Sequence, residues 1–142
     1  VPFSVGDRRR ADGQGEMALR TFEDLDVWRR ACRLAVAVCG ELRACKDFGL
    51  RDQMQGAAIS IPSNIAEGSE RDSRQDFVRF LRIAKGSAAE LRTQCYIASK
   101  LGVVPGSRFS EHAEDCKAIS AMLQALIRSL IPPESGKRNT EN

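Results

Sequence analysis

The segment FVRFLRIAKGSAAELRTQCYIA, residues 77–98, decides the fold of this chain. Its apolar residues recur at alternating spacings of three and four, so in a helix they form one stripe that faces a core. The stripe consists of Phe77, Leu81, Ala84, Ala88, Leu91, Cys95 and Ala98. This unbroken pattern predicts a long helix that ends near Gly102. Ser73, with Asp76 three residues later, predicts the N-cap at its start.

Three more stripes with the same spacing surround this segment. They predict helices over about residues 25–46, 50–67 and 107–130. The predicted core positions are Trp28, Cys32, Ala35, Cys39 and Leu42 in the first, Met54, Ala58, Ile61 and Ile65 in the second, and Cys116, Ile119, Leu123, Leu126 and Leu130 in the last. Short connections make sequential helices antiparallel neighbours, so the predicted fold class is all-α, an up-and-down four-helix bundle.

Two residues of the second predicted helix carry local signals. Pro62 lacks the N–H that would bond to the carbonyl of Ala58, so we expect a kink there or two shorter helical pieces. Gly68 is well placed to end this helix in a left-handed conformation. Phe48 and Gly49 are expected to separate the first two helices.

Composition fits one soluble domain. The chain has 142 residues, of which 42% are hydrophobic and 29% charged, and a bundle of this size folds without disulfides or metal. Five cysteines form an odd set with no C-x-x-C pair, which indicates a reducing, cytoplasmic environment. No apolar run approaches the roughly 20 residues that span a bilayer. Residues 1–16 and 132–142 lack a helical period, so we predict a disordered leader, a bundle domain over residues 17–131 and a disordered tail.

Three short motifs carry a resemblance to a known family. They are FEDLDVW at residues 22–28, SIPSNIAEG at 60–68 and GSAAEL at 86–91. In order and spacing they resemble the bacterial four-helix-bundle family first noted as reading frames inside intervening sequences of 23S ribosomal RNA. The resemblance covers roughly residues 21–130 and extends to the accessory variability determinant proteins of diversity-generating retroelements.

The resemblance implies a homo-oligomer and partners. Those relatives assemble as five-membered rings, so it implies a pentamer, and their partners are a reverse transcriptase and nucleic acid. Second apolar rows on the first and third helices are compatible with an oligomer surface, and equally with a wide core-facing face. These rows are Val27, Ala31, Leu34 and Val38, and Val78, Phe80 and Ile83.

The polar and small residues of the motifs are predicted to be structural. They are Asn64, Glu67, Gly68, Gly86, Ser87 and Glu90. A turn near Glu70 would place Glu67 level with Arg74, Glu90 level with Arg51 and Ser87 beside Met54. We therefore interpret Glu67 and Glu90 as members of ion pairs rather than as functional carboxylates. Gly86 is expected to allow close approach of the second and third helices.

No catalytic or metal site can be assembled from the remaining residues. His112 and Cys116 lie one helical turn apart, but zinc needs further ligands and no others are suitably spaced. A di-iron bundle would need Glu-x-x-His pairs, and the chain has one histidine. No nucleophile, base and orienting residue can be combined. We expect no enzyme activity, no metal and no cofactor.

Basic residues carry the remaining functional signal. The formal net charge of +3 is mild, but repetition around a ring would add basic patches into a field that attracts phosphates. The candidate nucleic-acid-binding residues are Arg29, Arg30, Arg33, Arg74, Arg79, Arg82 and Lys85. The leading hypothesis is a homo-oligomeric scaffold that binds RNA, DNA or an RNA–protein complex electrostatically. The alternatives are solvated helix faces without a partner, and a protein-interaction module that binds no nucleic acid.

Overall fold

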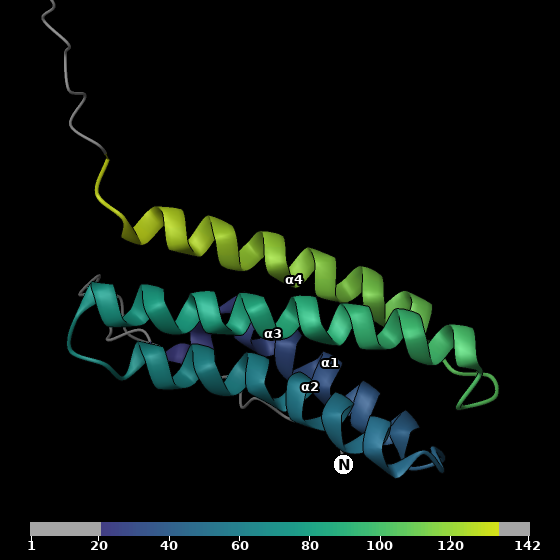
Figure 1. Ribbon diagram of the computed structural model, residues 1–142. Coiled ribbons are helices and arrows are strands. Elements are labelled where there is room, and N and C mark those ends of the chain that lie inside the picture. The colour runs from purple at the N-terminus through teal and green to yellow at the C-terminus, as the bar shows by residue number, and fades with distance from the viewer. Residues whose placement is uncertain (1–20, 134–142) are drawn as a thin grey trace, which may run out of the picture.

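The computed structural model describes residues 21–133, which form four helices after one turn of 3-10 helix, η1 (Phe22–Asp24). The helices are α1 (Asp26–Leu42), α2 (Phe48–Ser69), α3 (Arg74–Leu101) and α4 (Phe109–Leu130). They run antiparallel in sequence order (Figure 1), and no strand occurs within residues 21–133. The predicted all-α four-helix bundle is confirmed. The predicted leader, and the tail beyond Pro133, lie outside the described residues.

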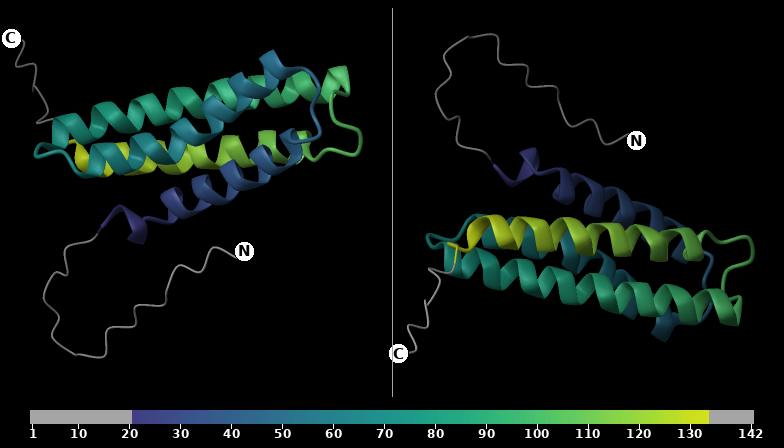
Figure 2. Two further views of the ribbon diagram at one scale, coloured as in Figure 1. Left: turned by 90° about the horizontal axis from the view of Figure 1, so that it is seen from below. Right: turned by 90° about the horizontal axis from the view of Figure 1, so that it is seen from above.

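Each helix packs against two others. α2 packs against α1 and α3, and α4 packs against α3 and α1, whereas the backbones of α1 and α3 do not approach each other closely in the described part of the chain. The two views in Figure 2 show this arrangement, with α1 and α3 at diagonal corners of the bundle. None of the helices in residues 21–133 combines the length and apolar character that crossing a bilayer requires.

The core confirms the predicted stripes of α2 and α3 and corrects that of α1. Met54, Ile61 and Ile65 of α2 are fully buried, as is the α3 stripe apart from a partly buried Phe77. In α1 the buried residues are Val27, Ala31, Leu34, Ala35, Val38 and Leu42. The core face of α1 is therefore a wide one, made of the predicted second row together with Ala35 and Leu42 of the predicted stripe. Trp28 and Cys39 pack at its edge, and Cys32 is half-buried. Both rows were similarly apolar, so periodicity could not rank them.

The connection between α1 and α2 differs from the prediction at both ends. The backbone N–H groups of Arg43, Ala44 and Cys45 bond to carbonyls three residues earlier, which tightens the chain after Leu42. The Asp47 carboxylate accepts a hydrogen bond from the Leu50 N–H at 3.1 Å and so caps α2. Phe48 and Gly49 thus begin α2. They are not part of a break.

Pro62 and Gly68 both lie inside α2. The helix continues through Pro62 to Ser69, so of the two expected outcomes the division into two shorter pieces is wrong, and the kink stays a prediction. Gly68 is not a left-handed stop, because within residues 21–133 only Gly102 and Gly106 have positive φ. A Cβ at Gly68 would lie 2.5 Å from the Cβ of Phe80, so this glycine permits close approach of α2 and α3.

The ends of α3 follow the sequence signals. The Ser73 hydroxyl accepts a hydrogen bond from the Asp76 N–H at 3.1 Å, which confirms the predicted N-cap. Gly102, with φ of 62°, closes the helix in the left-handed conformation. The start of α3 therefore lies beside the end of α4, at the opposite end of the bundle from the α3–α4 connection.

Candidate nucleic-acid interface

Three of the predicted basic residues line one groove between the start of α3 and the end of α4. This space, here called the arginine groove, has a volume of about 920 Å³. Its lining consists of Arg74, Gln75, Val78, Arg79, Arg82, Ile83, Leu130, Ile131 and Pro132. It thus combines three guanidinium groups with an apolar floor and contains no carboxylate.

The guanidinium groups of this groove remain open to solvent. Arg74 and Arg82 are exposed and form no ion pair with another described residue. Arg79 lies 3.6 Å from the Asp76 carboxylate in the first turn of α3, yet its side chain keeps 60% of its exposure. Its guanidinium carbon lies 4.7 Å from the centre of the Phe80 ring, and the guanidinium carbon of Arg71 lies 4.9 Å from the centre of the same ring, so the ring attracts both cations. The groove is electropositive and partly preorganised.

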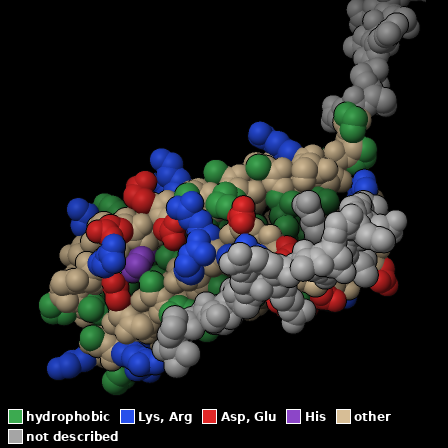
Figure 3. Space-filling view, turned by 180° about the vertical axis from the view of Figure 1, so that it is seen from behind, with side chains coloured by type: hydrophobic (Ala, Val, Ile, Leu, Met, Phe, Trp, Pro, Cys, Tyr) green, Lys and Arg blue, Asp and Glu red, His purple; other side chains and the backbone are tan. Residues whose placement is uncertain are grey.

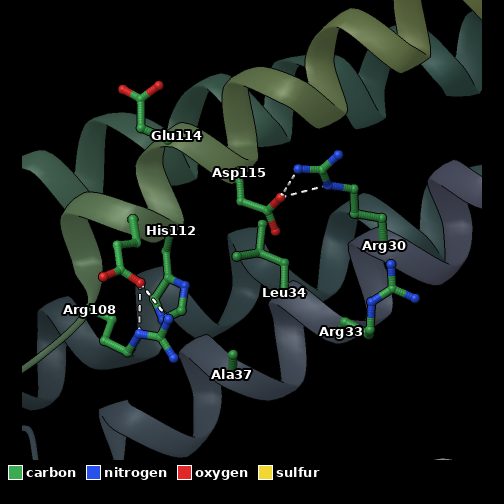
Figure 4. A pocket seen from close by; sticks show the side chains of 9 residues that line it. Arg30, Arg33, Leu34, Ala37, Arg108, His112, Glu114 and Asp115 are labelled. Carbon is green, nitrogen blue, oxygen red and sulfur yellow. Dashed lines mark hydrogen bonds and ion pairs between the residues drawn. The ribbon is translucent and has the colours of Figure 1, made fainter.

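A second groove, between α1 and the start of α4, contains both signs of charge. It has a volume of about 600 Å³ and brings together Arg30, Arg33, Arg108, Glu111, His112, Glu114 and Asp115. Arg30 and Asp115 form an ion pair at 2.6 Å, as do Arg108 and Glu111 (Figure 4). Figure 3 shows acidic and basic side chains interspersed around the one histidine on this face. These charges neutralise one another, so the second groove is a weak attractor for an anion.

The buried side chain of His112 belongs to a contact between α1 and α4. Its Nε2 atom lies 3.3 Å from a carboxylate oxygen of Glu41. The same carboxylate accepts hydrogen bonds from the Arg108 backbone N–H, with both oxygens at 3.2 Å. Glu41 thereby satisfies a backbone donor at the start of α4. Sequence reasoning missed Glu41, because its partners lie far away along the chain.

The predicted basic residues of α1 do not join those of α3 on one chain. Arg29 donates to the Glu23 carbonyl at 2.8 Å and lies within 4 Å of Asp24 and Asp26. Arg30 is occupied by Asp115, and Arg33 lines the second groove. Since α1 and α3 are diagonal, these arginines lie apart from the arginine groove.

Lys85 of α3 also lies outside the lining of the arginine groove. Its ammonium group donates to the Gln124 side chain of α4 at 2.8 Å. Two members of the predicted set, Arg30 and Lys85, thus bridge α4 to its neighbours.

The motif residues Asn64 and Ser87 both form hydrogen bonds with Ser60 of α2. The hydroxyl groups of Ser60 and Ser87 form a hydrogen bond at 2.8 Å. The Asn64 amide donates to the carbonyl and the hydroxyl of Ser60 at 2.8 and 2.9 Å. Two sequence motifs therefore form one polar link between the helices.

The partners predicted for the other motif residues are wrong. Glu67 pairs with Arg71 at 3.3 Å, and Glu90 accepts a hydrogen bond from Gln94 at 3.3 Å. The predicted partner of Glu90, Arg51, contacts Asp52 instead. The reason is the register: α2 continues to Ser69, so the turn lies at residues 70–73 and Ser87 bonds to Ser60 rather than lying beside Met54.

Gly86 does not make the predicted close approach. A Cβ there would meet nothing within 4 Å. Gly68 provides the close approach instead.

Burial accounts for the chemistry of the cysteines. It raises the pKa of the Cys95 and Cys116 thiols to about 12, with smaller contributions from Glu41 to Cys95 and from Cys95 to Cys116. Burial also raises the pKa of Cys32 and Cys39. A neutral thiol is a poor nucleophile and a poor metal ligand. Residues 21–133 contain no group of three His, Cys, Asp or Glu side chains arranged around a metal position.

The fold and its two grooves define a small helical-bundle protein with charged grooves between neighbouring helices. The family model described as 23S rRNA-intervening sequence protein matches residues 23–125, and the chain belongs to this family. A similar solved structure is that of a protein of unknown function from the S23 ribosomal protein family of Bacteroides thetaiotaomicron VPI-5482. It has a TM-score of 0.65 and 21% identity over 72% of this chain and 95% of that chain. At 21% identity, this similarity supports the same fold and nothing about function. No curated protein matches the chain.

Proposed function

We propose that this protein is a non-enzymatic, homo-oligomeric helical scaffold that binds nucleic acid electrostatically through the arginine groove. The observation that carries the proposal is the grouping of Arg74, Arg79 and Arg82 around a groove whose lining has no carboxylate. Guanidinium groups bind phosphate oxygens through paired N–H donors. The family is named after an intervening sequence of 23S rRNA, so RNA is the first polymer to test.

The position of the groove at the start of α3 adds to its attraction for phosphate. The helix N-terminus carries a partial positive charge, which favours anions within the first turn. Asp76 opposes this effect in part. The α1 arginines, which are paired within the chain or lie in the mixed-charge groove, would add to the long-range field. In this proposal, only the residues of the arginine groove contact the phosphates directly.

Self-association is supported by apolar side chains on the surface. Val36, Phe48, Ile59, Tyr96, Ile97 and Leu101 are each at least 43% exposed. Burial of such side chains between copies would remove apolar area from water. The resemblance suggests a ring of five, in which each copy would present one arginine groove. Repetition of the groove converts a weak single contact into strong multivalent binding.

The proposal is tested by binding of a fluorescent structured RNA to the full chain at rising salt. Neutralisation of about three phosphates per chain predicts a slope of log K against log salt near −3 for a duplex and near −2 for a single strand. The variant R74E/R79E/R82E should abolish binding. The matched control R43E/R92E/K117E reverses three exposed charges outside the groove and should retain most of the affinity. Equal losses in both variants would show that net charge, rather than the groove, attracts RNA.

A second candidate function is a protein-interaction module without nucleic-acid binding. The exposed Ile97 and Leu101 of α3 favour it, because they could be covered by another protein, such as a reverse transcriptase, as well as by another copy. An apolar protein interface should persist as salt rises, whereas RNA binding should weaken steeply. The same titration therefore separates the two functions.

A further inference from the structure

The arginine groove has an apolar floor that simple phosphate binding does not use. Val78 and Leu130 are partly buried beneath it, and Ile83 and Ile131 remain 43% and 42% exposed. Pro132 extends this surface at the end of α4. The groove therefore offers guanidinium groups and apolar contact surface side by side.

A nucleic-acid duplex cannot exploit such a floor. Its phosphates lie on the outside and its bases are stacked within, so it would contact the arginines alone. A single strand exposes base faces as well as phosphates, and proteins bind it by combining basic grooves with surfaces on which bases stack. The nine residues from Arg74 to Arg82 span about 12 Å of helix, which is enough for a short stretch of single-stranded nucleic acid.

Arg79 supplies a stacking surface that the sequence does not reveal. Its guanidinium carbon lies over the Phe80 ring, 4.7 Å from the ring centre, and the side chain is 60% exposed. A guanidinium group that stays this exposed can stack on an unpaired base. The ring of Phe80 itself is buried, so it positions the arginine rather than contacting the ligand.

From these features we infer that the arginine groove prefers single-stranded RNA, with phosphates on Arg74 and Arg82 and an unpaired base between Arg79 and the floor formed by Ile83 and Ile131. This inference rests on the proposed function, since it names the form of nucleic acid that the same groove takes. An acidic amphipathic peptide matches the charge and the floor, but it has no planar group to stack on Arg79. The groove therefore favours RNA over such a peptide.

The test compares four probes at one salt concentration: a short single-stranded RNA, the same sequence as a duplex, an oligouridylate and a polyglutamate peptide. The single strand should bind the full chain at least about tenfold more tightly than the duplex, because stacking is worth roughly that factor per base. The oligouridylate should bind too, because stacking tolerates sequence. Equal affinity for the duplex, or for polyglutamate, would overturn the inference while leaving the groove as an anion site.

Variants then identify the source of the preference. I83S/I131S should weaken single-strand binding by several-fold and leave duplex binding unchanged. Its control, I97S/L101S, removes exposed apolar side chains outside the groove and should not alter the preference. Arg79→Lys keeps the charge but loses the planar group, so it should reduce single-strand affinity without changing the salt slope.

The outcomes distinguish failure of the single-strand preference from failure of the proposed function. Unchanged single-strand affinity in I83S/I131S and Arg79→Lys would overturn the inference alone. Failure of every RNA to bind would overturn the inference and the proposed function together. Light scattering on each variant confirms that the assembly is the same in all comparisons.

Discussion

The hydroxyl groups of Ser60 in α2 and Ser87 in α3 lie 2.8 Å apart, and this hydrogen bond joins two of the three motifs through which the chain resembles its family. Asn64 completes the link by donating to both the carbonyl and the hydroxyl of Ser60. Ser87 is buried, so the link fixes the register of α2 against α3. The motif residues in this link therefore position helices, and the arginines on the outer surface of α3 are positioned with them.

Ser87→Ala should reduce the free energy of unfolding by about 1 kcal/mol, because it leaves the Ser60 hydroxyl with one partner fewer. The double variant S60A/S87A should cost less than the sum of the single changes, since the two hydroxyls share one bond. Urea unfolding followed by circular dichroism measures both. RNA affinity should stay unchanged. A loss of affinity without a loss of stability would place Ser87 in a binding site instead.

Gly68 and Gly86 form a matched pair for substitution by alanine. At Gly68 the new Cβ would lie 2.5 Å from the Phe80 Cβ, so Gly68→Ala should destabilise the bundle by about 1–3 kcal/mol. At Gly86 the new methyl group meets nothing, and alanine is the better helix former, so Gly86→Ala should stabilise by up to about 1 kcal/mol. Thermal unfolding midpoints should shift in opposite directions. Shifts of the same sign would contradict the close approach at Gly68.

Glu41→Ala should destabilise the contact between α1 and α4. It removes the acceptor for the Arg108 N–H and leaves buried His112 without its carboxylate neighbour. Hydrogen bonds to charged groups contribute about 1.5–3 kcal/mol, and we expect a loss at the lower end because Glu41 is 23% exposed. The control is Glu114→Ala, at an exposed position of the same groove, which should change stability by less than about 0.5 kcal/mol. Equal effects would show that Glu41 does not act as a cap.

Buried thiols predict a loss of stability at alkaline pH. The folded-state pKa values of Cys95 and Cys116 are about 12, above the ordinary value of 9.0. The unfolded chain therefore releases these protons first, so stability is fully present below pH 9 and declines as pH rises toward 12. C95A/C116A should show a shallower decline in urea unfolding over this range. An unchanged slope would mean that these thiols do not contribute.

Alkylation of the folded protein tests the burial of all five cysteines. Cys32 and Cys39 are partly exposed, whereas Cys45, Cys95 and Cys116 are buried. Iodoacetamide followed by mass spectrometry should modify the first two cysteines before the other three. Early modification of Cys95 or Cys116 would contradict their burial.

The spacing of apolar residues predicted the four helices correctly, but it did not predict which face of α1 is buried. The stripe of α3 has no competing row of comparable strength, so it identified the core. On α1 two apolar rows lie side by side, and only the position of the neighbouring helices decides that Val38 is buried and Cys39 is not. A register error of a few residues at the α2–α3 turn likewise sufficed to give wrong partners for Glu67 and Glu90.

The site could be predicted only in part. A sequence shows which residues are charged, but it does not show which of them are engaged by distant residues in the fold. Arg74, Arg79 and Arg82 were candidates, and they line one groove. Arg30 and Lys85 were equally good candidates, but residues of α4, distant in sequence, engage them. The apolar floor combines Ile83 of α3 with Ile131, which directly follows α4. No local sequence pattern specifies the register of these two helices.

The central claim is that arginine grooves on an assembled bundle bind RNA, and its most direct test is the mass of the full chain by light scattering, with and without a short RNA at low salt. The account predicts a particle several times the 15.6 kDa of one chain that gains the mass of bound RNA, and no gain for R74E/R79E/R82E. A particle of wild-type protein whose mass is unchanged by RNA would contradict the account.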